Sequence, residues 1–331
     1  MIKRDIPNSD LTLSVVGLGC WAIGGSMWGA QDDADSMQAI HAAVDAGVTW
    51  IDTAPIYGSG HSETIVGQAV QELPAERRPM IFTKFGLGDS LAQHRKSATR
   101  AEILSECEAS LRRLRCERID LYQLHWPVEQ PMEEIAGACA ELLQAGKIAA
   151  VGVSNFSVAQ LGAWQATGKP LHCLQAPYSL LRPAISVEST EEAEGQLPWC
   201  FANNLGCIAY SPLFRGMLFG TWNAEHTFAA DDIRGQHRDY SGVRFQRHLV
   251  AIDELRILGA EHDLTVPQLA IGALLATPGL TACIVGARNA RQGAALAELP
   301  AFLSQQQLTA VEDICARLRV VLAEMPAADA K

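Results

Sequence analysis

The stretch WIDTAPIYGSGHSE, residues 50–63, starts as an apolar strand that ends on Asp52. It continues through a turn with Pro55 and a glycine-rich loop that carries Tyr57. Taken alone, a strand-terminal aspartate is most often a turn or cap residue, and a single tyrosine is an ordinary half-buried aromatic. Whether this carboxylate and this phenol are structural or reactive depends on the sequence on either side.

Short apolar strands alternate with helical patterns along the whole chain. Eight candidate strands begin near Val15, Thr49, Met80, Asp120, Ile148, His172, Cys207 and Ala282. Between them, a spacing of three or four residues predicts helices with one buried face. Three such faces are Met37, Ile40 and Val44; Leu104, Cys107, Leu111 and Leu114; and Ile135, Ala138 and Leu142. Parallel strands need crossover helices, so eight strand–helix units favour a (β/α)8 TIM barrel over an open sheet.

The composition shows no break near the middle, so we expect one domain over residues 1–331. A long loop at about 212–245 is rich in glycine, aromatic and histidine residues, and loops of this length are usually functional or mobile. A further helix is expected at about 305–322. Residues 186–195, SVESTEEAEG, are expected to form a small acidic surface insertion.

Composition excludes several classes of protein. Apolar residues make up 48% of the chain and charged residues 19%, which is typical of a globular protein. The apolar runs are too short for a membrane span, and the first ten residues lack the apolar core of a signal peptide. The net charge of −11 disfavours nucleic acid, so any anionic ligand needs a local cluster of donors. Nine cysteines without a CxxC pair argue against disulfides or zinc and indicate a reducing cytoplasm.

A glycine motif near the N-terminus invites a different interpretation. Residues 17–22, GLGCWA, fit the loose GxGxxG/A fingerprint of a Rossmann dinucleotide site. That site needs a helix that starts directly at the glycines. Here about ten loop residues follow before a helix near Asp32, and Asp52 lies thirty residues beyond Ala22 rather than about twenty. We therefore expect glycines that let the chain turn, not a Rossmann site.

Reactive side chains gather at the ends of successive strands, which meet at the C-terminal face of a barrel. Asp52 ends the second strand and Tyr57 follows it, while Lys84 lies in the third strand and His125 follows the fourth. Each has an ordinary alternative, such as a lysine that reaches solvent or a satisfied core histidine. Four reactive types at three neighbouring strand ends are hard to explain by stability alone.

Together these groups suit the protonation of a carbonyl oxygen. A phenol is protonated at neutral pH, and a neighbouring ammonium favours its ionised form, which makes it a stronger acid. Asp52 would keep Lys84 charged and aimed, since a lone buried charge is costly. His125 would hydrogen-bond the substrate oxygen and orient it.

At this point the chain resembles the aldo-keto reductase superfamily, and most closely its bacterial branch that is similar to potassium-channel β subunits. The matching segments run in the family's order and cover nearly the whole chain. They are VGLGCWAIGG (16–25), IDTAPIYGSGHSE (51–63), IFTKFG (81–86), SLRRLRCERIDLYQLHW (110–126), GKIAAVGVSNF (146–156), LQAPYSLL (174–181), AYSPLFRGMLFG (209–220) and IVGARNARQ (284–292).

The resemblance implies a (β/α)8 barrel that binds NADPH across its C-terminal mouth and reduces aldehydes or ketones. It implies that Tyr57 is the proton donor, that Lys84 and Asp52 assist it, and that His125 orients the carbonyl. The implied cofactor contacts are Gly19, Cys20, Trp21, Asp52, Ser154, Asn155, Gln175, Tyr210, Ser211, Leu213, Arg215, Gly216, Gly286, Arg288 and Gln292. The implied substrate contacts are His125, Trp126 and Trp28, with further pocket walls from residues 87–96 and 214–245.

The chain departs from the family at one place. A Glu-Asn pair that commonly grips the adenine is replaced here by Ala295 and Leu296, which predicts weaker or purely apolar adenine contact. Arg288 still favours the 2′-phosphate of NADPH, because a guanidinium suits a phosphate dianion.

Other functions stay open at this point. One is a redox-sensing regulatory subunit with slow turnover, and another is a Schiff-base aldolase that uses Lys84. Metal-dependent hydrolysis is disfavoured because the sequence has no HxH or HExxH spacing. The expected partner is a small carbonyl compound or sugar, whose identity the sequence leaves open together with the oligomeric state.

Overall fold

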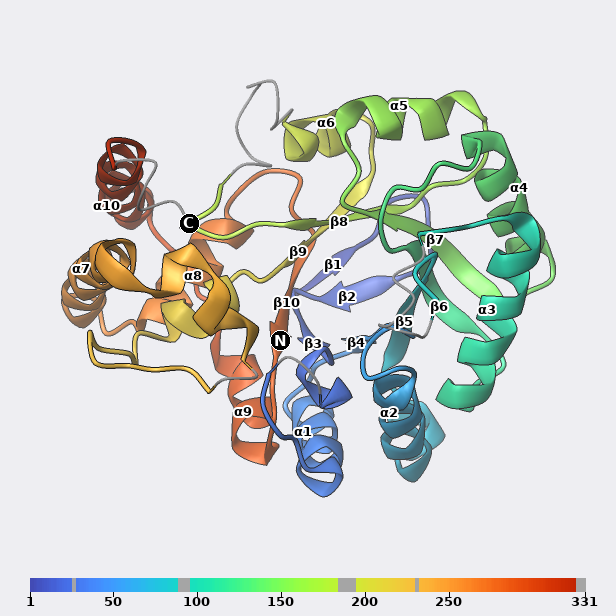
Figure 1. Ribbon diagram of the computed structural model, residues 1–331, viewed down its shortest axis with the longest axis horizontal. Coiled ribbons are helices and arrows are strands. Elements are labelled where there is room, and N and C mark those ends of the chain that lie inside the picture. The colour runs from blue at the N-terminus through green and yellow to red at the C-terminus, as the bar shows by residue number, and fades with distance from the viewer. Residues whose placement is uncertain (26–27, 89–95, 184–194, 230–231, 326–331) are drawn as a thin grey trace.

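Eight parallel strands close into a barrel in the computed structural model, which describes residues 1–25, 28–88, 96–183, 195–229 and 232–325 (Figure 1). The barrel order is β10-β3-β4-β5-β6-β7-β8-β9, so every strand neighbours its successor in sequence. The strands are β3 (Val16–Gly19), β4 (Trp50–Asp52), β5 (Met80–Phe85), β6 (Ile119–Leu124), β7 (Ile148–Ser154), β8 (Cys173–Pro177), β9 (Gly206–Tyr210) and β10 (Ala282–Gly286). The predicted (β/α)8 barrel is confirmed.

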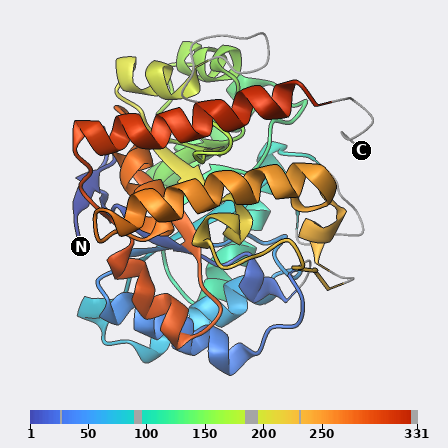
Figure 2. The ribbon, with the colours of Figure 1, turned by 90° about the vertical axis from the view of Figure 1, so that its left-hand side faces the viewer.

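Helices surround the barrel. They are α1 (Asp33–Asp45), α2 (His61–Glu72), α3 (Arg100–Leu114), α4 (Met132–Gln144), α5 (Val158–Ala166), α6 (Gln196–Ala202), α7 (Gly242–Ala260), α8 (Val266–Leu275), α9 (Ala290–Ala295) and α10 (Gln305–Ala323). Several begin at a capping box, for example Thr99 with Glu102 at α3 and Ser304 with Gln307 at α10. Figure 2 shows α10 lying alongside α7 on the outside of the molecule.

Two predicted helical faces differ in part from the observed ones, namely that of α1 and, at the partly buried Leu104, that of α3. On α1 the buried residues are Ser36, Ala39, Ile40 and Ala43, whereas Met37 and Val44 are only partly buried. The reason is the close approach of α9, where a Cβ added to Gly293 would lie 2.3 Å from the carbonyl oxygen of Ala39. Small residues therefore occupy this contact, while Met37 packs against the core and is only partly buried.

The long connection from β9 to α7 contains short 3-10 segments, η4 (Phe214–Phe219), η5 (Ile233–Gln236) and η6 (Arg238–Tyr240). Within η4 the backbone is non-helical at Arg215 and Gly216. The predicted acidic insertion falls mostly on residues 184–194, outside the described residues. The assignment of the whole chain to one domain stays a prediction. Within the described ranges, none of the helices combines the length and hydropathy that crossing a membrane requires.

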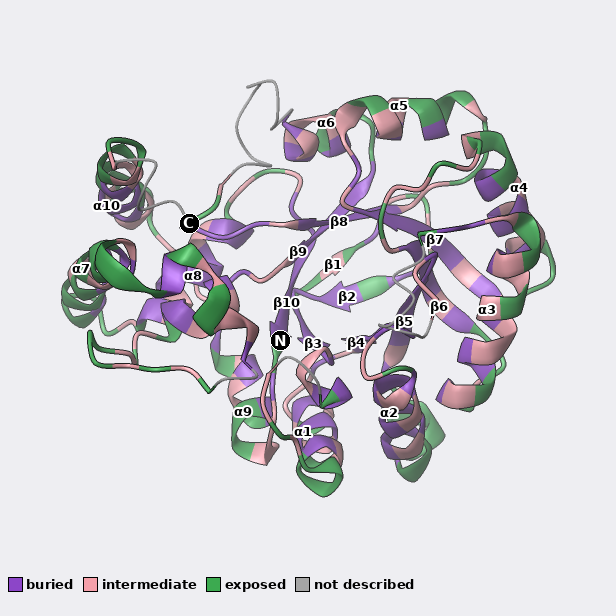
Figure 3. Ribbon diagram, in the orientation of Figure 1, coloured by how far each residue is buried: buried purple, intermediate pink, exposed green. Residues whose placement is uncertain are grey.

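The barrel interior changes from apolar to polar along its axis. One cluster of buried residues fills the middle, including Trp50, Phe82, Leu121 and Cys173. The hairpin of β1 (Lys3–Asp5) and β2 (Thr12–Ser14) closes the N-terminal end, with the following Ile6 fully buried in the same cluster. Figure 3 shows the barrel strands as mainly buried, while exposed residues lie on the outer sides of the helices.

Inward-facing side chains recur at every second residue of a strand. Two residues beyond the apolar layer, the same faces carry polar groups. These are Asp52, Lys84, Gln123 and Gln175, all of them buried. The C-terminal end of the barrel is therefore polar and its N-terminal end is apolar, as in a barrel whose site lies at the C-terminal mouth.

Candidate active site

A buried ion pair lies at the centre of the polar layer. The Lys84 ammonium donates to Asp52 Oδ1 at 2.5 Å and to the Thr53 carbonyl oxygen at 2.9 Å. The side chains of Lys84 and Asp52 are 1% and 4% exposed. A buried charge without a partner costs several kcal/mol, so neither group is expected to be tolerated there alone. The pairing predicted from the neighbouring strand ends is present.

The second oxygen of Asp52 accepts from two glutamines. Gln175 Nε2 lies 2.9 Å and Gln123 Nε2 lies 3.2 Å from Asp52 Oδ2. Our sequence reasoning missed Gln123, because it lies within β6 and not at a strand end. The alternation of side chains along β6 could have identified it. Gln123 is two residues beyond the inward-facing Leu121, so it also faces the barrel interior, on a face that is otherwise apolar.

Tyr57 is brought to Lys84 by the loop that joins β4 to α2. Its hydroxyl lies 3.5 Å from the Lys84 ammonium, which is also 5.2 Å from the centre of the tyrosine ring. The loop is held against the segment after β3 at Gly58, where a Cβ would lie 2.2 Å from the Gly24 carbonyl oxygen. Ser62 fastens the end of the loop, since its hydroxyl donates to the Cys20 carbonyl oxygen at 2.9 Å.

Burial and charge act in opposite directions on these groups. Burial would lower the pKa of Lys84, but the Asp52 carboxylate and Tyr57 more than offset it, so the pKa is raised. The same environment raises the pKa of Tyr57 to about 12, because burial outweighs the opposing effect of Lys84. The expectation of a phenol that is a stronger acid than free tyrosine is therefore wrong in its net direction. Lys84 only limits the increase.

His125 follows β6 directly and stands beside the phenol. Its ring lies edge-on to that of Tyr57, with 5.8 Å between the centres. Burial, followed by the Lys84 charge, holds the pKa of His125 well below its ordinary value of 6.5. The imidazole is thus neutral near pH 7 and carries one N–H donor. Asp52, Lys84, Tyr57 and His125 meet at one end of the barrel.

The predicted cofactor contacts form a continuous rim from β7 round to β3. Tyr210 donates its hydroxyl to Asn155 Oδ1 at 2.8 Å, and the Asn155 amide donates to the His125 carbonyl oxygen at 3.1 Å. Gly286 and Gly19 pair directly across β10 and β3. A Cβ on Gly286 would find only the Gly19 carbonyl oxygen, 3.7 Å away, so bare backbone borders open space there.

Other members of the predicted cofactor set differ in how their side chains are placed. Cys20 and Leu213 are buried in the core, so their side chains are not exposed at the rim. Ser154 and Gln175 are also buried, at the floor of the mouth. Trp21, Ser211, Arg215 and Gly216 are partly exposed in the loops above.

Arg288 lies at the entry to α9 and is already engaged. Its guanidinium donates to Gln31 Oε1 at 2.7 Å and to the carbonyl oxygens of Trp28 and Ala30 at 3.2 and 2.5 Å. Gln292 accepts from the Arg288 backbone N–H at 2.9 Å. Leu296 is 2% exposed and packs in the protein core, so its side chain is not available for apolar contact with an adenine.

The two tryptophans predicted to line the substrate pocket stand in different surroundings. Trp28 meets Trp21 edge-on, with 5.2 Å between ring centres, and the Arg234 guanidinium lies 4.9 Å from its ring. Trp126 is 39% exposed and has the Lys96 ammonium 4.9 Å from its ring. Of the predicted wall at residues 87–96, positions 89–95 lie outside the described residues.

This barrel and its mouth define the class of protein. The model of the Aldo/keto reductase family matches residues 15–316, and the chain belongs to that family. Its members are oxidoreductases that reduce carbonyl groups with nicotinamide cofactors. The resemblance read from the sequence is confirmed.

Individual relatives cover most of the chain. An aldo-keto reductase of Bacillus subtilis is 40% identical over 90% of this chain and 88% of its own length. An Escherichia coli protein named NADH-specific methylglyoxal reductase is 35% identical over 88% of this chain and 91% of its own. The solved structure of a glycerol dehydrogenase from Gluconobacter oxydans superposes with a TM-score of 0.85, at 38% identity and 95% coverage of both chains.

Proposed function

We propose that the protein is an NADPH-dependent reductase of aldehydes or ketones in which Tyr57 donates the proton. The observation that carries this proposal is the Lys84 ammonium, which bonds Asp52 and lies 3.5 Å from the Tyr57 hydroxyl at the mouth of the barrel. A phenol beside a fixed positive charge can give its proton to a carbonyl oxygen as that oxygen gains negative charge.

Four residues of the chain act together on the carbonyl group of the substrate. Tyr57 gives its proton to the substrate oxygen, and the adjacent Lys84 ammonium stabilises the phenolate that remains. Asp52 keeps that ammonium charged and aimed. The neutral His125 donates its ring N–H to the substrate oxygen and orients it. The chemistry that a bound reduced nicotinamide supplies is a hydride for the carbonyl carbon.

The mouth of the barrel fits such a cofactor. Amide and hydroxyl groups of Ser154, Asn155 and Gln175 suit a carboxamide, and the Tyr210 ring offers a flat face for an aromatic ring. The bare backbone at Gly286, which pairs with Gly19, allows a ligand to approach closely. The loop with Ser211, Leu213, Arg215 and Gly216 is proposed to hold the phosphates.

The proposal is tested by assaying purified protein for oxidation of NADPH and NADH with a panel of aldehydes and ketones. We expect aldehyde-dependent oxidation of NADPH with rapid turnover. Tight NADPH binding, measured by fluorescence titration, combined with turnover of fewer than about one event per minute would instead favour the regulatory subunit.

Cofactor preference is predicted to depend on Arg288. Replacing Arg288 with alanine should raise the KM for NADPH by about 10–100-fold, the loss of a charge-assisted bond to phosphate, and change the KM for NADH by less than about threefold. Gln31→Ala is the matched control, because Gln31 contacts Arg288 without carrying charge. Equal increases for both cofactors in Arg288→Ala would show that the arginine only supports the loop at residues 28–31.

The pH dependence of reduction follows from the two shifted groups. The phenol, with a pKa of about 12, is protonated at all lower pH values, so the proton donor is present throughout the usual range. His125, with its lowered pKa, is neutral above that value and stays so through neutral pH. We therefore expect kcat/KM for reduction to be flat between about pH 6 and pH 9. A break within this range that disappears in His125→Asn would contradict the assignment of a neutral imidazole.

A further inference from the structure

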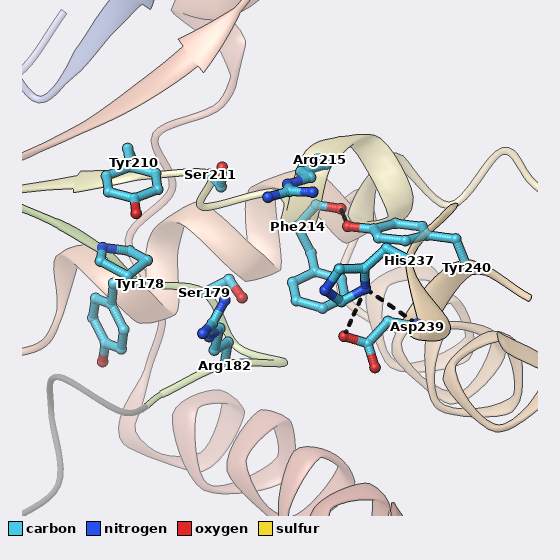
Figure 4. Close-up of a pocket in the computed structure, with 11 residues that line it drawn as sticks. Tyr178, Ser179, Arg182, Tyr210, Ser211, Phe214, Arg215, His237, Asp239 and Tyr240 are labelled. Atoms are coloured by element: carbon cyan, nitrogen blue, oxygen red, sulfur yellow. Dashed lines mark hydrogen bonds and ion pairs between the residues drawn. The ribbon is translucent and has the colours of Figure 1, made fainter. Parts of the chain in front are cut away.

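A pocket opens between the loops that follow β8 and β9. Figure 4 shows it with the Tyr210 ring at one end and the segment of η6 at the other. Its lining residues are Pro177, Tyr178, Ser179, Arg182, Tyr210, Ser211, Phe214, Arg215, His237, Asp239 and Tyr240. It combines aromatic walls with two arginines and a histidine, and its Arg182 belongs to none of the predicted catalytic or cofactor contacts.

Two guanidinium groups extend into this pocket from opposite loops (Figure 4). Arg182 closes a tight turn in which its backbone N–H donates to the Ser179 carbonyl oxygen at 3.0 Å. Arg215 holds a left-handed backbone with φ of 50°. Across the ranges that the structure describes, neither guanidinium has a hydrogen-bond or ion-pair partner. In a chain with a net charge of −11, two such groups facing one space indicate a site for an anion.

Two other arginines near the pocket, Arg234 and Arg244, are in contrast paired with carboxylates. Arg234 donates to both oxygens of Asp232, at 2.9 and 3.2 Å from its Nε. Arg244 pairs with Asp239, the one carboxylate in the pocket lining. The charge of Asp239 is therefore already balanced by Arg244, and it does not cancel Arg182 and Arg215.

The surrounding titratable groups respond to this positive potential. Burial lowers the pKa of His237, and Arg215 and Arg182 lower it further against the effect of Asp239. Burial raises the pKa of Tyr210, while Arg182, Arg215 and Lys84 oppose the increase. Tyr210 lines the pocket, and its hydroxyl donates to Asn155 Oδ1 at 2.8 Å, while the Asn155 amide donates to the His125 carbonyl oxygen at 3.1 Å. These contacts connect the pocket to the mouth of the barrel that holds His125.

We propose that this pocket binds the anionic group, a carboxylate or a phosphate, of the carbonyl substrate. The inference rests on the proposed reductase function and names a substrate class for it. The carbonyl end would lie near Tyr57 and His125, and the apolar body would pass the Phe214 ring. The anion would meet Arg182 and the side chain of Arg215, whose backbone is in the loop proposed to hold the cofactor phosphates. Arg215 also belongs to the proposed cofactor loop, so Arg182 provides the cleaner test.

The test compares acids with their neutral esters as substrates of the whole enzyme. Succinic semialdehyde and 4-carboxybenzaldehyde are each assayed against the corresponding methyl ester with NADPH. We expect the wild-type enzyme to prefer at least one acid over its ester by about tenfold or more in kcat/KM, as for a charge-assisted contact. Arg182→Gln should reduce that ratio to about one. Arg238→Gln, which removes the same charge from an exposed residue outside the lining, should keep the ratio.

Three results would overturn the inference. The first is a wild-type enzyme that reduces both esters and shows no preference for either acid. The second is a preference that survives in Arg182→Gln. The third is an Arg182→Gln enzyme with a raised KM for NADPH and an unchanged acid-to-ester ratio, which would assign the pocket to a cofactor phosphate. Failure to reduce any of the four compounds, or other aldehydes, would overturn the reductase function itself.

Discussion

Replacing Tyr57 with phenylalanine should lower kcat for aldehyde reduction by about 10²–10⁴-fold, the contribution typical of a positioned general acid. The ring and its contacts with Trp21 and His125 would remain, because only the hydroxyl is removed. The dissociation constant for NADPH should therefore change by less than about threefold. Stopped-flow turnover and fluorescence titration on the same preparation measure the two quantities.

A matched control for Tyr57→Phe is Tyr122→Phe. Tyr122 is fully buried on β6, and its hydroxyl has no hydrogen-bond partner among the described residues. Removing that hydroxyl should leave turnover near the wild-type value and leave stability unchanged or slightly increased. If Tyr57→Phe kept more than about a tenth of wild-type turnover, another group would have to be the proton donor.

Replacing Lys84 with methionine should lower both stability and activity. The change leaves Asp52 buried with two glutamine donors but without its cation, and breaking a buried pair in this way costs about 3–5 kcal/mol in free energy of unfolding. Turnover should fall by about 10²–10³-fold, because the phenolate left by proton transfer loses its stabilising charge. Urea unfolding and steady-state assays give the two numbers.

The double variant Asp52→Asn/Lys84→Met separates the two effects. It removes both charges from the barrel interior, so most of the lost stability should return. Turnover should stay at the level of the single Lys84→Met variant, because the cation beside Tyr57 is still absent. A double variant that recovers activity together with stability would mean that the lysine acts only by holding the fold.

The cluster of Asp52, Lys84, Tyr57 and His125 was predictable because barrel geometry brings the ends of neighbouring strands together. Asp52 and Lys84 lie near the ends of neighbouring parallel strands, and such ends meet at one rim whatever the details of the helices. The ion pair between them follows from the cost of burying either charge alone. Tyr57 reaches Lys84 only because the loop that carries it packs closely against the segment after β3. The backbones of Gly24 and Gly58 touch there, and neither residue has a Cβ that would prevent this contact.

Contacts between loops were not predictable in the same way. Nothing in the local sequence pairs Trp28 with Arg234, or Arg182 with Arg215, since each pair joins segments whose distance depends on how whole loops pack. The direction in which the pKa of Tyr57 shifts could not be predicted from the sequence either. It depends on whether burial or the Lys84 charge is the larger influence, and only the position of the phenol in the mouth decides this.

The amino-acid sequence by itself determined the barrel, its strand ends and the types of side chain gathered there, because alternation and helical spacing are local properties repeated eight times. Tertiary structure alone decided the balance of burial against charge at Tyr57, the engagement of Arg288 by the Trp28–Gln31 segment, and the meeting of Arg182 and Arg215 in one pocket beside Tyr210. These features arise from distances between segments far apart in the chain, and such distances exist only once the barrel has closed.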